Sequence, residues 1–361
     1  MSMDQDDVRS DPVAGAVTAH DRPVVVTGAA GFVGSHLVRA LVHAGRHVIA
    51  SDVAETFPRD RLRGLDDLAL DYVPGDLRSP ALVEHIVGSG DVVDVVNTAA
   101  IIAFGQLGTA LHGTSAGPET ALRSLDVNAR AAWVLCAGLA GAGALGRFLH
   151  VSTRSVYGAR PATAEPIAES DPPQPAGVYG SSKAAAELGL LALREQLGVD
   201  LVIARITGVF GPWQGPASFI GQAVDDVVAG RAHETATGGD DAYELTYVKD
   251  TVRGLMLLAA ADRLGHAVYH VASGDRLIPL REVGEAIGRA DSGARVTFGP
   301  GAHTGSGGRT PLAISRIRDE LGFATRWPLD AAVADYLRIE CGGPYGAESL
   351  DEPGLPDEGD R

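Results

Sequence analysis

The sequence of 361 residues contains little cysteine and shows no metal-binding pattern. Its two cysteines, Cys136 and Cys341, form no CxxC pair and lie near no histidine cluster with metal-ligand spacing. This usage excludes a disulfide framework and predicts no metal site. It fits a reducing, cytoplasmic location best.

Excess positive charge and long apolar segments are also missing. The chain has 30 Lys and Arg against 46 Asp and Glu, a net charge of -16 and a pI near 5.0, which argues against nucleic acid or an anionic membrane as a partner. No segment approaches the roughly 20 uninterrupted apolar residues of a membrane-spanning helix, and the first residues lack an export signal. We therefore predict a protein that is neither exported nor membrane-bound.

What the sequence does contain is ample apolar material, 45% of its residues, for a large core. Residues 1–21 and 341–361 are polar, acidic or Gly/Pro-rich and are predicted to be tails outside it. Over residues 22–205, β-branched runs alternate with helical patterns, which predicts an α/β fold with a Rossmann-type, doubly wound parallel sheet. Residues 206–340 are predicted to form a smaller mixed α/β substrate-binding lobe, interleaved with the first domain.

The individual elements can be located from the same alternation. Strands are predicted at 23–28, 47–52, 71–76, 92–100, 147–153 and 200–205, and helices at 32–44, 80–87, 120–140, 179–197, 280–290 and 315–321. The irregular segment from Phe104 to Thr120 is long for a connection in a compact domain, which is typical of a lid or an insert.

The stretch "VVVTGAAGFVGSHL", Val24 to Leu37, has glycines at Gly28, Gly31 and Gly34 directly behind a β-branched run. Their GxxGxxG spacing alone is weak evidence, but the turn follows a predicted strand and opens a predicted helix. Unpaired amides and the positive helix end then face a pyrophosphate, and glycine permits its close approach. We predict a dinucleotide site that includes the next two residues of the turn, Phe32 and Val33.

Two carboxylates extend this site. Asp52 ends the second predicted strand, where a carboxylate binds the adenosine ribose and repels a 2′-phosphate, so NAD is favoured over NADP. Arg59, Arg61 and Arg63 either soften that preference or form an exposed basic loop. In "VPGDL", Asp76 and Leu77 either receive the adenine or are an ordinary strand end.

The motif "VYGSSK" contains Tyr179 and Lys183, which share one face of a helix at i,i+4. A phenol with a pKa of about 10 is a poor base at neutral pH, but an adjacent ammonium and the positive nicotinamide would favour its phenolate. Tyr179 could then exchange a proton with a substrate hydroxyl during hydride transfer. The alternative is a chance Tyr and Lys on an amphipathic helix. The preceding strand end supplies the hydroxyls of Ser152, Thr153 and Ser155, whereas Tyr157 is interpreted as a packing residue.

In order, "TGAAGFVGSHL", Asp52, "GDL", "NTAA", "VSTRSVYG" and "YGSSK" resemble the extended short-chain dehydrogenase/reductase family of the NAD-dependent epimerase/dehydratase type, over Val24 to Tyr336. The resemblance implies Tyr179 and Lys183 as the catalytic pair, with Thr153 assisting and Lys183 also holding the nicotinamide ribose. It further implies that Ala99, Ala100 and Asn128 belong to the cofactor site, Asn128 by ordering the central sheet. A homodimer through the helices of Asn128 and Tyr179 is implied as well.

The sequence departs from this family at three places. Arg154 and Ser155 stand where the dehydratases carry an acidic pair, which disfavours dehydration. Gly208 stands where the nucleotide-sugar epimerases carry an Asn. Tyr243 stands where the same enzymes carry a diphosphate-binding Arg. Both changes lower the expectation of a nucleotide-diphosphate substrate.

The stretch "VVNTAAIIAFG" is similar to the 3β-hydroxysteroid dehydrogenase branch, whose substrates carry no nucleotide. We therefore predict an NAD-dependent oxidoreductase that interconverts a secondary alcohol and a ketone on a small or cyclic metabolite. The alternatives are an epimerase of a sugar or sugar nucleotide that retains its cofactor, and a non-catalytic dinucleotide sensor. The predicted substrate residues are Ile101, Phe104, Arg154, Ser155, Gly208, Val209, Trp213 and Tyr243.

Overall fold

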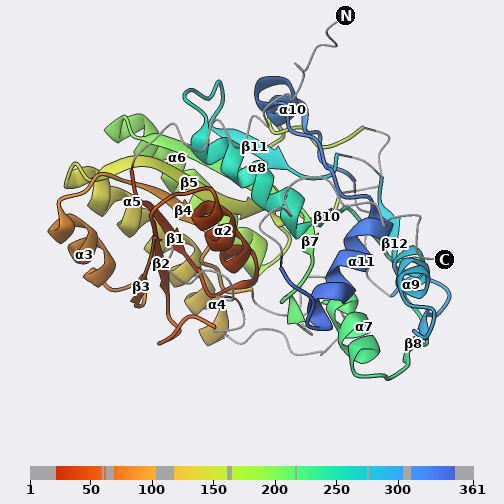
Figure 1. Cartoon of the computed structure of the whole chain (residues 1–361). Helices are drawn as coiled ribbons and strands as arrows, with labels where there is room; N and C mark the ends of the chain where they lie inside the picture. Colours follow the sequence, from red (N-terminus) through yellow and green to blue (C-terminus); the bar gives the residue numbers. More distant parts are fainter. Residues whose placement is uncertain are drawn as a thin grey trace, which may run out of the picture.

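The computed structural model describes residues 22–58, 61, 69–102, 118–160, 165–215, 218–274, 276–303 and 310–345. Its first half alternates strands and helices as the sequence predicts (Figure 1). The elements are β1 Val24–Thr27, α2 Phe32–His43, β2 Val48–Asp52, β3 Leu70–Pro74, α3 Ala81–Ser89, β4 Val93–Asn97, α4 Pro118–Leu125, a π-helical turn Asp126–Arg130, α5 Ala131–Gly141, β5 Leu145–Thr153, a 3₁₀ turn Arg154–Tyr157, α6 Val178–Leu197 and β6 Asp200–Ile206.

The second half contains shorter strands and four further helices before α11. They are β7 Gly208–Phe210, α7 Phe219–Val228, β8 His233–Thr235, β9 Ala242–Tyr243, β10 Leu245–Tyr247, α8 Val248–Ala260, β11 Val268–Val271, β12 Ile278–Pro279, α9 Leu280–Ala290, β13 Val296–Phe298, α10 Ser315–Leu321 and α11 Leu329–Glu340. Helices α7, α9 and α11 lie together beyond the end of the central sheet (Figure 1).

A seven-stranded parallel sheet in the order β11-β6-β5-β4-β1-β2-β3 forms the centre of the molecule. This confirms the predicted doubly wound fold. The chain reverses direction across the sheet between β1 and β4, which is the position where open α/β sheets bind ligands at the carboxyl ends of their strands. The predicted glycine-rich turn follows β1 and therefore lies at this point.

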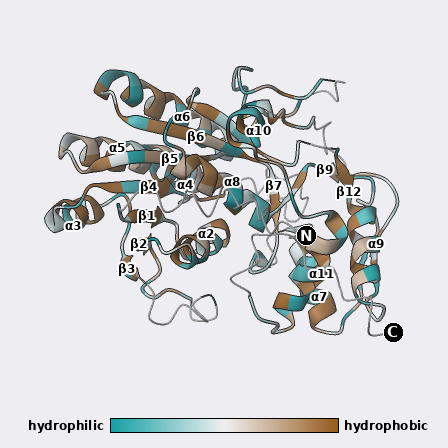
Figure 2. Ribbon diagram, turned by 45° about the horizontal axis from the view of Figure 1, so that its top comes forward, coloured by the Kyte–Doolittle hydropathy of each residue, from teal (hydrophilic) through white to brown (hydrophobic). Residues whose placement is uncertain are grey.

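Successive side chains of β1 point to opposite faces of the sheet, and the core has two layers accordingly. Val24 and Val26 pack with α2 and α8 in one cluster of buried side chains, while Val25 packs with α3, α5 and α6 in another. Strands covered by helices on both faces are expected to be apolar throughout, and the hydrophobic residues along the sheet show this pattern (Figure 2). The first cluster continues into α9 and α11, so the second half of the chain shares the core of the sheet.

Two features of the fold differ from the sequence predictions or were absent from them. The helix predicted over 120–140 is divided by the π-helical turn that holds Asn128. Helices α7, α8 and α11 were not predicted. Strand β11, from the predicted lobe 206–340, pairs with β6 in the central sheet, so the two segments are interleaved there. The predicted lid, from Phe104 to Thr120, lies outside the described residues except at its end.

Candidate active site

The glycine-rich turn between β1 and α2 is as tight as its spacing indicates. Gly28 has a φ of +67°, and a Cβ on it would lie 2.7 Å from the Ala99 backbone. A Cβ on Gly34 would lie 2.1 Å from the Gly28 carbonyl oxygen. Gly31 precedes the first residue of α2 and donates its amide to the Gly28 carbonyl at 3.0 Å. Backbone can therefore approach a ligand closely here, at the N-terminus of a helix.

Asp52 ends β2 beside this turn, as predicted. Its carboxylate accepts hydrogen bonds from the Ala30 amide at 3.0 Å and the Ala54 amide at 3.2 Å. Arg61 donates to the Ala30 carbonyl at 2.6 Å and lies near the Trp213 ring. Arg61 is therefore half-buried and does not belong to an exposed loop. An effect of Arg61 on the choice between NAD and NADP stays a prediction, and Arg59 and Arg63 lie outside the described residues.

Asp76 follows β3 and is engaged by Arg78. The Arg78 guanidinium donates to both carboxylate oxygens, which is the main reason that the Asp76 pKa is lowered. Leu77 packs against the core cluster of α3, α5 and α6. An adenine contact by Asp76 stays a prediction, and it would have to be made beside Arg78.

Asn128, in the π-helical turn, ties the end of β4 to α6. Its Oδ1 accepts from the Ile101 amide at 2.7 Å, and its Nδ2 donates to the Ile101 carbonyl and to Ser182 Oγ, both at 2.9 Å. The side chain thus fixes the chain that follows Ala99 and Ala100. Both N–H groups are used in this way, and a part of Asn128 in cofactor binding stays a prediction. π-Helical turns within helices are frequent at functional sites.

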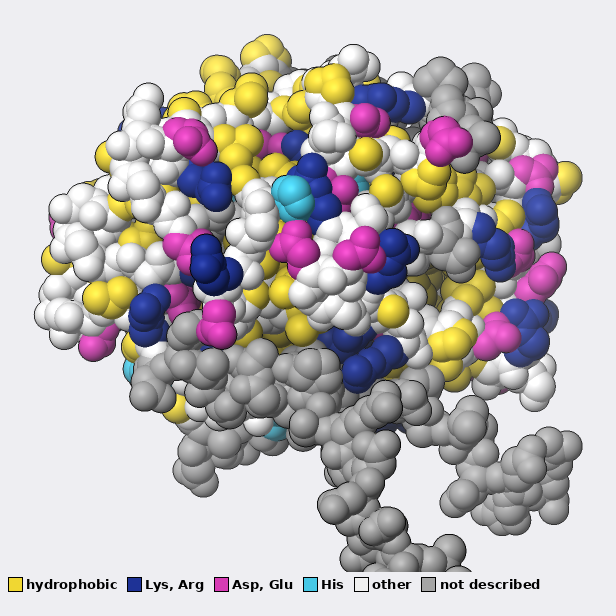
Figure 3. Space-filling model, turned by 90° about the horizontal axis from the view of Figure 1, so that it is seen from above, with side chains coloured by type: hydrophobic (Ala, Val, Ile, Leu, Met, Phe, Trp, Pro, Cys, Tyr) yellow, Lys and Arg dark blue, Asp and Glu magenta, His cyan; other side chains and the backbone are white. Residues whose placement is uncertain are grey.

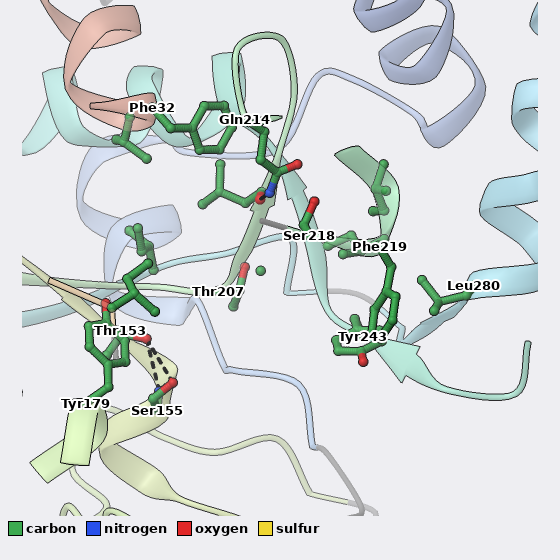
Figure 4. Close-up of a pocket in the computed structure, with 17 residues that line it drawn as sticks. Phe32, Thr153, Ser155, Tyr179, Thr207, Gln214, Ser218, Phe219, Tyr243 and Leu280 are labelled. Atoms are coloured by element: carbon green, nitrogen blue, oxygen red, sulfur yellow. Dashed lines mark hydrogen bonds between the residues drawn. The ribbon is translucent and has the colours of Figure 1, made fainter. Parts of the chain in front are cut away.

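The predicted catalytic group comes together at the carboxyl end of β5 (Figure 4). Thr153 Oγ1 accepts from the Ser155 amide at 3.1 Å and forms a hydrogen bond with the Tyr179 hydroxyl. Lys183 is buried and donates to the Val151 carbonyl at 2.6 Å. Tyr157 packs inside the protein, where its hydroxyl lies 2.6 Å from His270 Nε2.

Burial affects the ionisation of both members of the predicted catalytic pair. Burial raises its pKa to about 12, against the lowering effect of the Thr153 hydrogen bond. Burial also lowers the pKa of Lys183 to about 8, and Glu187 opposes this shift. The chain alone therefore holds the Tyr179 phenol protonated, and its use as a base depends on how well positive charge is kept beside it.

A cavity opens between the end of β5 and the second half of the chain (Figure 4). It is lined by the start of α2, by Thr153 and Tyr179, and by residues of β7, α7 and β9. Its side chains are apolar or uncharged, and no Lys, Arg, Asp, Glu or His is among the described residues that line it. They are Phe32, Val33, Ile102, Thr153, Ser155, Tyr179, Ile206, Thr207, Gly208, Val209, Gln214, Ser218, Phe219, Ile220, Tyr243, Leu245 and Leu280.

Four of the predicted substrate residues, Ser155, Gly208, Val209 and Tyr243, line this cavity, and Phe104 lies outside the described residues. Ile101, Arg154 and Trp213 do not line it, so contact of these three with substrate stays a prediction.

Arg154 turns away from the cavity. Its guanidinium donates to the Thr310 carbonyl at 3.1 Å. Burial raises the pKa of Glu244 to about 7, and the charge of Arg154 opposes this rise. Glu244 is held behind the cavity by the amides of Leu312 and Gly274.

Trp213 also faces elsewhere, because it stacks on His36 and Tyr345. Its φ of +65° is unusual for a residue other than glycine. Its amide donates to Glu340 at 2.6 Å.

The sequence analysis missed Gln214, which lies next to Trp213. Gln214 donates its side-chain amide to the Val209 carbonyl at 2.8 Å, and its Oε1 is buried without a hydrogen-bond partner among the described residues. Phe219, Ile220 and Leu280 were missed as well, because they come from helices far along the chain. No sequence signal beyond their apolar character distinguishes them.

Acidic and basic side chains are interspersed on the face in Figure 3. Among the described residues, no group of three or more His, Cys, Asp or Glu could hold a metal ion. No helix in the described part of the chain is long and apolar enough to cross a membrane.

Comparison with known proteins gives consistent matches. The model of the NAD dependent epimerase/dehydratase family matches residues 24–272. dTDP-glucose 4,6-dehydratase of Streptomyces niveus is 30% identical over 306 residues, 84% of this chain and 88% of that protein. UDP-glucuronate 4-epimerase 2 of Arabidopsis thaliana is 28% identical over 249 residues, 64% of this chain and 53% of that protein. The solved structure of MoeE5 in complex with UDP-glucose and NAD has a TM-score of 0.69 at 27% identity, covering 88% of this chain and 97% of that one.

Proposed function

The chain belongs to the NAD-dependent epimerase/dehydratase family, and from that premise we propose that it is an oxidoreductase that interconverts a secondary alcohol and a ketone on a small or cyclic metabolite. The observation that carries this proposal is the cavity, whose described lining is uncharged and includes the start of α2 and Tyr179. Its volume of about 230 Å³ is below the usual range for drug-sized ligands, which suits a small substrate.

The residues fit the family's cofactor. The cradle at Gly28 and Gly34 leaves no room for a Cβ, as a pyrophosphate held against backbone amides requires. Asp52 would hold the adenosine ribose, and Lys183 the nicotinamide ribose. NAD, when bound, supplies the hydride acceptor for alcohol oxidation.

The chain's own part in the reaction is proton transfer and orientation. Tyr179 takes the hydroxyl proton of the substrate, and Thr153 orients the reacting oxygen through its hydrogen bond to Tyr179. Lys183 contributes the positive charge that stabilises the phenolate. In the reverse direction the same hydroxyl returns the proton to the ketone.

Dehydration has less support, although a dehydratase is among the similar proteins. Elimination of a hydroxyl needs an acid within reach of the leaving oxygen. No carboxyl group lines the described part of the cavity. Arg154, in the place of the expected acid, is directed to Thr310.

The proposal can be tested with purified protein and NAD. Cyclic secondary alcohols and dTDP- or UDP-hexoses are supplied in turn, and net NADH formation is followed by absorbance. Net NADH with an alcohol that carries no nucleotide is the expected result. Strong thermal stabilisation by nucleotide hexoses, without a response to the alcohols, would contradict it.

A second candidate is an epimerase of a sugar nucleotide. It is favoured by the likeness to UDP-glucuronate 4-epimerase 2 and to MoeE5, which was solved with UDP-glucose and NAD. It uses the same Tyr179 and Lys183 but returns the hydride to the opposite face of the substrate. Inverted hexose without net NADH would distinguish it from the first candidate.

Replacing Asp52 by asparagine is expected to weaken NAD binding about tenfold and to strengthen NADP binding. A hydrogen bond to a charged group contributes about 1.5–3 kcal/mol, and removing the carboxylate also removes its repulsion of a 2′-phosphate. Both dissociation constants can be measured by titration calorimetry. Asp71→Asn is the matched control, because Asp71 lies on β3 and pairs with His47 away from the turn. An NAD constant changed less than twofold in Asp52→Asn would refute the role.

We also propose that the protein is a homodimer, with α4, α5 and α6 in the interface. Exposed apolar side chains are unusually frequent on these contacting helices, which is typical of an interface; they are Leu122, Leu125, Trp133, Val134 and Leu188. Leu188→Glu is expected to yield monomers in sedimentation velocity, since a buried carboxylate would lack a partner. Leu197→Glu, at the exposed end of the same helix, should leave the dimer intact. A monomeric wild-type protein would contradict the proposal.

A further inference from the structure

One face of α6 carries a third polar side chain beyond the catalytic pair. Tyr179, Lys183 and Glu187 follow one another at intervals of four residues, so they lie in line along the helix. Lys183 and Glu187 are both buried, each with 1% of its surface exposed. Charged side chains are almost never buried to this degree unless they are paired.

Glu187 and Lys183 hold consecutive residues of β5. Lys183 Nζ donates to the Val151 carbonyl at 2.6 Å, and Ser152 Oγ donates to Glu187 Oε1 at 2.5 Å. The next residue of the strand is Thr153, which hydrogen-bonds Tyr179. Both charged side chains therefore anchor α6 to the strand end that supplies the catalytic hydroxyl.

Arg205 completes the set from the neighbouring strand. In the register of β5 and β6 it stands beside Ser152. Its Nε lies 3.1 Å from both oxygens of Glu187, and its Nη2 lies 2.6 Å from Oε2. The Glu187 carboxylate is thus held in one orientation by Ser152 and a bidentate guanidinium.

The titratable groups around Lys183 and Glu187 come from three elements. Tyr179 and Glu187 lie on α6, Arg205 on β6 and His150 on β5. His150 accepts from Asn97 Nδ2 at 3.1 Å on its Nδ1, and burial together with the Lys183 charge keeps its pKa well below the usual range. Glu187 is therefore the anion that offsets two buried cations, Lys183 and Arg205.

We propose that Glu187 is a positioning residue of the active site: fixed by Ser152 and Arg205, it keeps the Lys183 side chain charged and directed at the end of β5. A buried ion pair contributes little to stability compared with apolar residues of the same size. Stability alone therefore does not explain the Glu187–Arg205 pair beside the catalytic lysine. Burial favours the neutral amine, and the Glu187 charge opposes that effect. The proposal rests on the proposed function only where it calls Lys183 catalytic.

The composition of the chain allows the charge on Lys183 to be measured directly. Lys183 and Lys249 are its two lysines, so protein labelled with ¹³C-lysine gives two Cε signals. The signal lost in Lys183→Met identifies Lys183. Its titration midpoint is then followed by NMR in the full-length protein, without turnover or substrate.

In Glu187→Gln the Lys183 midpoint is expected to fall by about one to two pH units, as loss of a buried opposite charge at this spacing implies. The alkaline limb of the pH–rate profile, where Lys183 loses its proton, should move with it. Glu195→Gln is the matched control, because Glu195 lies on α6 but is exposed, and it should leave the midpoint unchanged. Should Glu187→Gln fail to fold, Glu187→Gln with Arg205→Met removes both charges of the pair. A smaller fall is then expected, because the loss of Arg205 also removes a positive charge that repels Lys183.

An unchanged Lys183 midpoint in either variant, with only a loss of stability, would overturn the proposal and leave the pair a structural one. A wild-type protein that oxidises no alcohol would contradict the proposed function instead. The titration of Lys183 would still be measured in that case, so the two failures can be told apart.

Discussion

Tyr179→Phe is expected to lower kcat about 1,000-fold while leaving NAD affinity within a factor of two. A positioned acid–base group contributes about 10²–10⁴-fold to a rate. Tyr179 lines the cavity, and its ionisable hydroxyl lies next to Thr153. Phenylalanine keeps the ring and its packing but cannot exchange a proton. Steady-state rates with the alcohol identified by the NADH assay, together with NAD titration, measure the two effects.

Tyr243→Phe is the matched control for this substitution, because Tyr243 lines the same cavity from its other side. Loss of the Tyr243 hydroxyl should affect KM and change kcat by less than about tenfold, as expected for a group that binds substrate without taking part in proton transfer. A kcat for Tyr179→Phe within tenfold of the wild type would identify another base and exclude the proposed mechanism.

Gly34→Ala is expected to weaken NAD binding about a hundredfold and to lower the free energy of unfolding by about 1–3 kcal/mol. Its Cβ would lie 2.1 Å from the Gly28 carbonyl oxygen and 2.9 Å from Thr98 Oγ1, so the start of α2 must move away from the turn. Overpacking at a rigid backbone contact has this order of cost, and small displacements of positioned groups are costly for function. Titration calorimetry and urea denaturation measure the two quantities.

Two other glycines give a graded control. A Cβ on Gly31 would lie 3.0 Å from the Gly28 oxygen, so Gly31→Ala should have a smaller effect on NAD binding. A Cβ on Gly88, in α3, meets nothing within 4 Å, and Gly88→Ala should stabilise the protein by about 0.5–1 kcal/mol. Equal NAD affinities in all three variants would show that the turn does not hold the dinucleotide.

The elements that the sequence predicts well are those with a local periodic signal. The helices at 280–290 and 315–321 are confirmed to the residue, and the one at 179–197 differs by one residue. Helix α8 was not predicted, because nearly all of its residues are buried and these include Lys249, Asp250 and Arg253. Polar residues in its sequence therefore do not mark a solvent-facing side. The π-helical turn at Asn128 has no sequence signal of its own.

The orientations of neighbouring side chains were harder to predict than their identities. Arg154 follows Thr153 directly, yet the 3₁₀ turn sends it to Thr310 while Thr153 faces the cavity. Trp213 and Gln214 are also adjacent, but Gln214 alone lines the cavity. In irregular segments the side-chain direction depends on backbone dihedral angles that residue type constrains only weakly.

By itself the sequence determined the glycine-rich turn, the carboxylate of Asp52 and the Tyr179–Lys183 pair. Each of these depends on residues within about 20 positions, whose spacing fixes their geometry once strand and helix form. Only the tertiary structure decided the uncharged lining of the cavity and the contacts of Glu187 with Ser152 and Arg205. Those side chains come from separate elements, and the register of parallel strands, which is set by packing across the whole sheet, brings them together.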